Sequence, residues 1–197
     1  ILQQLGHDPR PVLRRVGLSL KTMSNPDMIV PFAKIGRLLS ACAEVSGCPY
    51  FGLLVGQQVP TSALGVLGFT IQNATDVDTA LSNLIRYRGL NDRGGFITLE
   101  RDGVLARLQY SIINHNVAGA DQICDCAIAI GCSILRALCG RNWSPTEVLL
   151  AHPSPGDRTP FDTFFRCPVR FSAVYSGLVF NRRWLEKAPP AADPLLY

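Results

Sequence analysis

The sequence predicts an α+β domain, in which N-terminal helices are followed by an antiparallel four- to five-stranded sheet with a long packed helix. Three observations predict this class. Up to Gly89, apolar residues recur at the three- and four-residue steps of helices. The period then changes to two alternating segments joined by Asp102-Gly103, a dipeptide that favours a tight turn between antiparallel strands. Residues 118–139 follow as an apolar segment without proline, long enough for about six helical turns.

Capping residues, apolar repeats and glycine or proline stops divide the N-terminal part into helices and loops. The expected helices cover residues 8–17, 31–46, the two apolar halves of 51–69, and 73–89, with a proline-containing loop at 24–31. Within 51–69, glycine recurs at Gly52, Gly56, Gly65 and Gly68. Because glycine is unfavourable inside a helix, this cluster indicates a corner where helices pack closely, in preference to a site where a ligand lies against the backbone.

Shorter elements are expected around the long helix. Strands are predicted at residues 96–101, 104–112, 147–153, 169–172 and 177–180, a short helix at 156–166, and a proline-rich linker from residue 188. The helix at 118–139 is apolar nearly all round, so it is either packed between the sheet and a second copy of the protein or wholly buried. If its outer face is an interface, Ile128→Glu or Ile134→Glu is expected to give a folded monomer.

Composition narrows the class of protein. The 197 residues suffice for one domain with a sizeable core, 47% of them are hydrophobic and only 17% are charged. So apolar a composition predicts that a partner, a further domain or a ligand-filled cavity covers part of the surface. The apolar runs are interrupted well below the roughly 20 residues that cross a bilayer, so no transmembrane helix is expected. The chain does not begin with Met, and we expect it to belong to a longer protein.

Charge and cysteine content argue against a DNA-binding surface and against a metal site. The formal net charge of +4 is small and the arginines are scattered, whereas a DNA-binding domain carries a denser basic stripe. Of the seven cysteines, Cys124 and Cys126 are the closest in sequence, but neighbours two apart point to different faces of a helix. We therefore interpret the cysteines as buried reduced thiols, which favours a cytoplasmic location, and expect neither a metal site nor a cofactor.

The order of several sequence blocks is distinctive. FGLLVGQ and SALGVLGF precede the hairpin, the long helix ends in LCGRNWSP, and EVLLAHP, FFRCPVRFSA and GLVFNRRWL follow it. Together these blocks, over residues 31–185, resemble the N-terminal regulatory domain of AraC-type transcriptional regulators, in the group with an arabinose-binding-type domain. The resemblance implies a domain that binds a small effector and dimerises within a transcription activator. It also implies a C-terminal helix-turn-helix domain that binds promoter DNA.

On this resemblance, residues 1–187 are expected to form the effector-sensing and dimerisation domain. Residues 188–197 are expected to begin the linker to a DNA-binding domain that this chain does not contain. The sugar in the group's label is not carried over, because no set of aromatic and carboxylate residues in the sequence singles out a sugar.

Four residues are candidates for contact with the effector. Arg86 and Arg88, at the end of a predicted helix, could clamp a carboxylate, although cations are favoured at a helix C-terminus in any case. Tyr110 could offer a hydroxyl inside an apolar pocket, or be half-buried in the core. Gly68 would let a ligand approach the backbone.

The sequence contains no recognisable catalytic constellation. His115 is expected to be a solvated loop residue, His152 a packing residue at the end of a strand, and Tyr175 either a pocket or a core residue. Phosphate-loop and dinucleotide-binding fingerprints are missing. Two alternatives to the sensor stay open, namely an enzyme with an unrecognised site and a dimerisation module that has lost its ligand.

Overall fold

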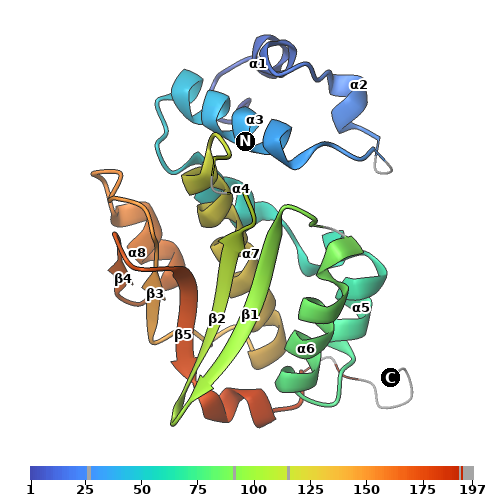
Figure 1. Ribbon diagram of the computed structural model, residues 1–197, viewed down its shortest axis with the longest axis vertical. Coiled ribbons are helices and arrows are strands. Elements are labelled where there is room, and N and C mark those ends of the chain that lie inside the picture. The colour runs from blue at the N-terminus through green and yellow to red at the C-terminus, as the bar shows by residue number, and fades with distance from the viewer. Residues whose placement is uncertain (26–27, 91, 115, 191, 193–197) are drawn as a thin grey trace.

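The computed structural model describes residues 1–25, 28–90, 92–114, 116–190 and 192 (Figure 1). Within these ranges the chain forms eight α-helices and one five-stranded sheet, which confirms the α+β class. The first three helices lie together at one end of the molecule, while the sheet and the long helix α7 form its body (Figure 1).

The N-terminal half is helical, as predicted. Asp8 caps the first helix by accepting a hydrogen bond from the amide of Arg10, and Gly47 ends the third in a left-handed conformation. A short helix capped by Ser19 was not predicted, because its four residues are too few to show a period. The helices are α1 (Pro9–Arg15), α2 (Leu20–Met23), α3 (Phe32–Ser46), α4 (Phe51–Gln58), α5 (Val66–Gln72) and α6 (Val77–Tyr87), with 3-10 turns η1 (Thr61–Leu64) and η2 (Arg88–Leu90).

The sheet has the strand order β1-β2-β5-β3-β4. Its strands are β1 (Gly95–Asp102), β2 (Leu105–Ile112), β3 (Glu147–Leu149), β4 (Val169–Arg170) and β5 (Ser176–Asn181). Neighbours pair antiparallel except β3 and β4, which are parallel. The sheet is therefore mostly antiparallel, as the sequence predicted, with one parallel pair. The reason is that α8 (Thr159–Phe165) lies between β3 and β4 in the chain and provides the crossover that a parallel pair needs.

The third strand is shorter than predicted. β3 ends at Leu149, and two residues later the amide of Ala151 donates to the Ser176 hydroxyl, 3.0 Å away, instead of to a strand carbonyl. His152 consequently follows the strand in a bend and does not lie within the sheet.

The long helix α7 (Ala120–Cys139) is enclosed by its own chain. It packs on β2 and β5 on one side and contacts α3 and α4 on another. All of α7 is described, and of its residues only Asp121 and Ala137 are exposed. Ile128 and Ile134 are each 3% exposed, so the expectation that a glutamate at either position gives a folded monomer is wrong. Such a substitution would place a charge in the core.

By length and composition, α7 also meets the criteria for a membrane-crossing helix, with 20 residues and a mean hydropathy of 1.6. No such segment was expected, because polar residues and glycines interrupt the apolar runs of the sequence. A core helix meets the same criteria, and α7 has the sheet and two helices packed around it.

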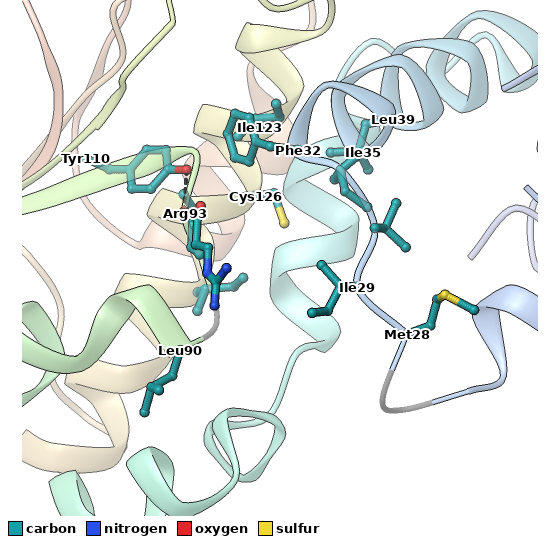
Figure 2. Close-up of a pocket in the computed structure, with 14 residues that line it drawn as sticks. Met28, Ile29, Phe32, Ile35, Leu39, Leu90, Arg93, Tyr110, Ile123 and Cys126 are labelled. Atoms are coloured by element: carbon teal, nitrogen blue, oxygen red, sulfur yellow. Dashed lines mark hydrogen bonds between the residues drawn. The ribbon is translucent and has the colours of Figure 1, made fainter. Parts of the chain in front are cut away.

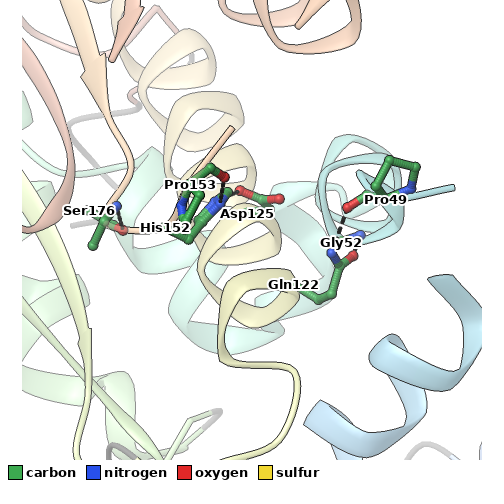
Figure 3. A network of polar contacts seen from close by, with 8 residues as sticks. Pro49, Gly52, Gln122, Asp125, His152, Pro153 and Ser176 are labelled. Carbon is green, nitrogen blue, oxygen red and sulfur yellow. Dashed lines mark hydrogen bonds and ion pairs between the residues drawn. The ribbon is translucent and has the colours of Figure 1, made fainter. Parts of the chain in front are cut away.

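Helices α4 and α7 pack so closely that the backbone of one touches the backbone of the other. A Cβ atom at Gly52 would overlap the carbonyl of Gln122, and one at Gly56 would overlap the carbonyl of Cys126. The Gln122 side chain fastens the contact, because its Oε1 accepts from the amide of Gly52 and its Nε2 donates to the carbonyl of Pro49, each at 2.7 Å (Figure 3). The interpretation as a close-packed helix corner is confirmed for Gly52 and Gly56, whereas a Cβ at Gly65 would meet no atom within 4 Å.

The end of the described chain is attached to α6. The turn η3 (Arg182–Glu186) packs against this helix, and the amide of Val77 donates to the carbonyl of Lys187 at 2.9 Å. The first residue of α6 therefore holds the segment that leaves the sheet after β5.

We predict that Gly52→Ala lowers the free energy of unfolding by about 3 kcal/mol, the upper end of the cost of overpacking, because the new methyl group meets backbone that cannot rotate away. Urea denaturation would measure this change. Gly89→Ala is the matched control, since a Cβ there meets no atom within 4 Å. Equal stability of the two variants would contradict the proposed role of the α4–α7 contact.

Candidate functional site

A cavity of about 580 Å³ separates the N-terminal segment from the body of the domain. Met28 and Ile29 lie on one side of it, and Leu90 and Arg93 lie on the opposite side (Figure 2). Most of the lining residues have apolar side chains, and they come mainly from three regions far apart in the sequence: residues 28–39, the connection before β1, and the first half of α7. It consists of Met28, Ile29, Val30, Phe32, Ile35, Leu39, Leu90, Asp92, Arg93, Tyr110, Ile123, Cys126, Ala127 and Ile130.

A smaller cavity of about 220 Å³ adjoins the first one. It lies among α5, α6, the sheet and α7, and most of its lining side chains are aliphatic, with Arg88, Asp92, Gln109 and Tyr110 as the polar ones. Asp92, Tyr110, Ala127 and Ile130 line both cavities, so these four residues mark the junction.

A hydrogen-bonded pair stands at this junction. The hydroxyl of Tyr110 donates to Oδ2 of Asp92 at 2.7 Å, while Oδ1 accepts from the amides of Gly94 and Gly95 at 2.8 and 3.1 Å. Burial and the neighbouring carboxylate raise the pKa of Tyr110, so its hydroxyl stays protonated. Both carboxylate oxygens of Asp92 thus already have donors.

Two arginines line these cavities, and neither forms an ion pair with a carboxylate in the described part of the chain. Arg88 lines the smaller cavity, and its Nε is buried with no hydrogen-bond partner among the described residues. Arg93 lines the larger cavity, is exposed, and donates from Nε to the carbonyl of Gly89 at 3.3 Å. With Asp92 as the one carboxylate among the described lining residues, the lining carries a formal excess of one positive charge.

The structure brings together two of the four residues that the sequence suggested. Arg88 and Tyr110 line the same cavity. Arg86 is exposed outside both cavities, with its guanidinium carbon 5.4 Å from the centre of the Tyr87 ring. Gly68 packs against η1, where a Cβ would overlap the carbonyl of Thr61, and it lines neither cavity.

Sequence reasoning missed Asp92, Arg93 and the wall formed by residues 28–32. A signal for Asp92 was available, because an aspartate two residues before a Gly-Gly pair often binds the backbone amides that follow it. Arg93 and the N-terminal wall had no local signal, since their place at the cavity depends on how α3 crosses α7.

His152 is a buried packing residue, as predicted. Its Nε2 lies 2.8 Å from Oδ1 of Asp125, and its Nδ1 lies 2.9 Å from the carbonyl oxygen of Pro153 (Figure 3). A carbonyl only accepts, so Nδ1 carries a hydrogen. Burial opposes charge on the imidazole, but the hydrogen bond and charge of Asp125 outweigh it and raise the pKa of His152. Burial likewise raises the pKa of Asp125.

The remaining candidates offer no reactive group. His115 lies outside the described residues, and Tyr175 is half-buried and lines a separate cavity of about 240 Å³ that Tyr110 and His152 also line. All seven cysteines fall within the described ranges and are free thiols. Burial raises the pKa of Cys124 to about 11 and that of Cys126 to about 12, so both are protonated at neutral pH. In the described part of the chain, no three His, Cys, Asp or Glu side chains gather as a metal site.

Comparison with known proteins places this architecture in a family. Residues 6–188 match the model of the arabinose-binding domain of AraC transcription regulators, an N-terminal domain. The chain belongs to this family. The AraC-type resemblance noted from the sequence blocks is therefore confirmed.

Relatives of this AraC-type domain are transcription regulators. The chain is 23% identical over 196 residues to the HTH-type transcriptional regulator VirS of Mycobacterium tuberculosis, covering 98% of this chain and 58% of that protein. It is 22% identical over 176 residues to the ornithine utilization regulator of Pseudomonas aeruginosa, covering 88% of this chain and 51% of that protein. The chain thus spans about half the length of these relatives.

The fold also matches a solved structure. The transcriptional regulator CdpR of Pseudomonas aeruginosa superimposes with a TM-score of 0.64 and 19% identity, over 75% of this chain and 48% of that one. At this identity the likeness supports the fold of the AraC-type domain and nothing further.

We predict that the free energy of unfolding falls as the pH rises above about 6.5, because the folded chain keeps a proton on the His152–Asp125 pair that the unfolded chain releases. The pKa of His152 is raised from 6.5 on folding, so its contribution is complete below that value and is lost as the pH passes the raised value. One proton accounts for at most about 1.4 kcal/mol per pH unit. Urea denaturation over a pH series would measure this slope.

Asp125→Asn is the control for this prediction. The Asn amide can donate to a neutral Nε2 while Nδ1 keeps its hydrogen for Pro153, so the contact survives without the extra proton. The slope should flatten in this variant. A slope equal to that of the parent chain would show that other groups carry the pH dependence.

Proposed function

We propose that the chain is the effector-sensing and dimerisation domain of an AraC-type transcription regulator, and that a small effector binds in the two adjoining cavities. The observation that carries this proposal is the larger cavity of about 580 Å³, within the usual size of a small-molecule site. Its apolar lining with a few polar groups at one place is also the usual character of such a site.

The position of the cavity supports a sensing role. A ligand inside it would touch residues 28–39 on one side and α7 with residues 90–93 on the other. It would therefore bind one arrangement of the N-terminal segment more tightly than another. Only such differential affinity allows a ligand to shift a conformational equilibrium.

In the whole protein, a second domain following the linker would bind promoter DNA. Such a regulator would act in the cytoplasm. We propose no enzymatic activity for this domain. The buried thiols are protonated, and His152 uses both ring nitrogens in contacts within the chain. The relatives, too, are regulators by name.

Ala127→Phe tests the proposed site. Ala127 lines both cavities, so the phenyl ring would fill their junction and weaken effector binding by at least about tenfold. Thermal-shift screening against a metabolite panel, followed by calorimetry on each hit, would measure the loss. Ala137→Phe is the matched control, because it makes the same change at an exposed position of the same helix.

Two results would contradict the proposal. Compounds that stabilise both variants equally would bind outside the cavities. Conversion of a hit into product by the purified domain would favour the enzyme alternative over the sensor.

Dimerisation is tested by sedimentation velocity on the purified domain over a concentration series. We expect a species of twice the chain mass at micromolar concentrations. Its interface must lie away from the buried face of α7 that carries Ile128 and Ile134. A monomer at every concentration would contradict this part of the proposal.

A further inference from the structure

We propose that the effector is an amphipathic anion whose acidic group binds the guanidinium of Arg88, while its apolar body lies along the aliphatic side chains of the two adjoining cavities. This inference rests on the proposed function and specifies the chemistry of its ligand. Three independent features of the cavities support it: their lining, their charge and the apolar side chains exposed around them.

The lining fits an apolar body. Few polar side chains face the cavities, and two of these, Asp92 and Tyr110, are hydrogen-bonded to each other. A sugar or another polyol would bury many hydroxyl groups without partners, each at a substantial cost in free energy. An alkyl or aromatic body meets no such cost.

The charge fits a single acidic group. The buried Nε of Arg88 has no partner among the described residues, and Asp92 cannot easily serve because three donors already hold its carboxylate. A carboxylate on the ligand would accept from two N–H groups of the guanidinium at once, which is the strong geometry for this pair. The ligand's charge would also neutralise the excess positive charge of the lining.

Exposed apolar side chains surround the larger cavity. Ile29 is 80% exposed and Leu90 is 75% exposed, and they lie on opposite sides of the cavity (Figure 2). Met28, also exposed, lies beside Ile29. Water-exposed apolar side chains that face one cavity from both sides are typical of a ligand-binding groove. The apolar body of the effector would cover them.

The position of Arg88 orients the ligand. It lines the smaller cavity together with Asp92 and Tyr110, two of the residues that mark the junction with the larger one. Arg93 is exposed at the larger cavity and would attract an anion without enclosing it. We therefore assign the anchoring contact to Arg88.

The test uses three probes that share one apolar body and differ in charge: octanoate, octanol and octyltrimethylammonium. Calorimetry on the 197-residue chain should give octanoate an affinity about 10- to 100-fold above that of octanol, the range of hydrogen bonds to charged groups, with octyltrimethylammonium the weakest. Arg88→Gln should remove the preference for octanoate and leave octanol binding unchanged. Unchanged octanol binding also shows that the variant is folded.

Two further variants make the assignment specific. Arg86→Gln removes an equal charge two residues away, outside both cavities, and should keep the preference. Arg88→Lys keeps the charge but lacks the planar pair of donors, so it should keep only part of the preference.

Three outcomes would overturn the inference. They are equal affinities for octanoate and octanol, a preference that survives in Arg88→Gln, and no binding of any of the three probes. Failure of the proposed function is a separate result, in which Ala127→Phe leaves the binding of every ligand intact. Equal binding of octanoate and octanol that Ala127→Phe abolishes would overturn the acidic group and leave the effector site in place.

Discussion

The backbone contact between α4 and α7 is the constraint on which the rest of the domain depends. Glycines allow it, and Gln122 fastens it from one side. A second contact of the same kind joins α3 to the start of α7, where a Cβ at Gly36 would overlap the carbonyl of Ala118 and one at Gly119 would overlap the carbonyl of Gly36. These two crossings place the N-terminal helices over the central helix. Residues 28–39 thereby become a wall of the larger cavity instead of a separate lobe.

The cavities combine mostly apolar side chains with a small polar group made of Arg88, Asp92 and Tyr110. Hydrogen bonds from Tyr110 and from two backbone amides satisfy Asp92, and among the described residues the buried Nε of Arg88 has no acceptor. A buried N–H group without an acceptor costs free energy. A ligand that accepts from Arg88 would remove this cost. Arg88 and Asp92 follow shortly after the end of α6. The aliphatic side chains of the smaller cavity come from α5, α6, α7 and the sheet.

Local signals account for what the sequence predicted. Caps at Asp8 and Asp76, the glycine stop at Gly47 and the Asp102-Gly103 turn act over a few residues, so the helices and the hairpin were found close to their actual bounds. The parallel pairing of β3 with β4 and the burial of α7 depend on contacts between distant segments, and no local pattern carries them. The same division holds at the site. Tyr110 and Arg88 were suggested by their residue types near the ends of elements, whereas Arg93 and the N-terminal wall follow from helix crossings.

The attachment of the described C-terminal segment to α6 has a mechanical consequence. This helix has eleven residues and so is about 16 Å long. Its last residue leads into Arg88 and the cavity, and its first residue holds the carbonyl of Lys187. A ligand that displaced Arg88 would therefore act on one end of a helix whose other end is bonded to Lys187, the residue that follows the last turn of the domain.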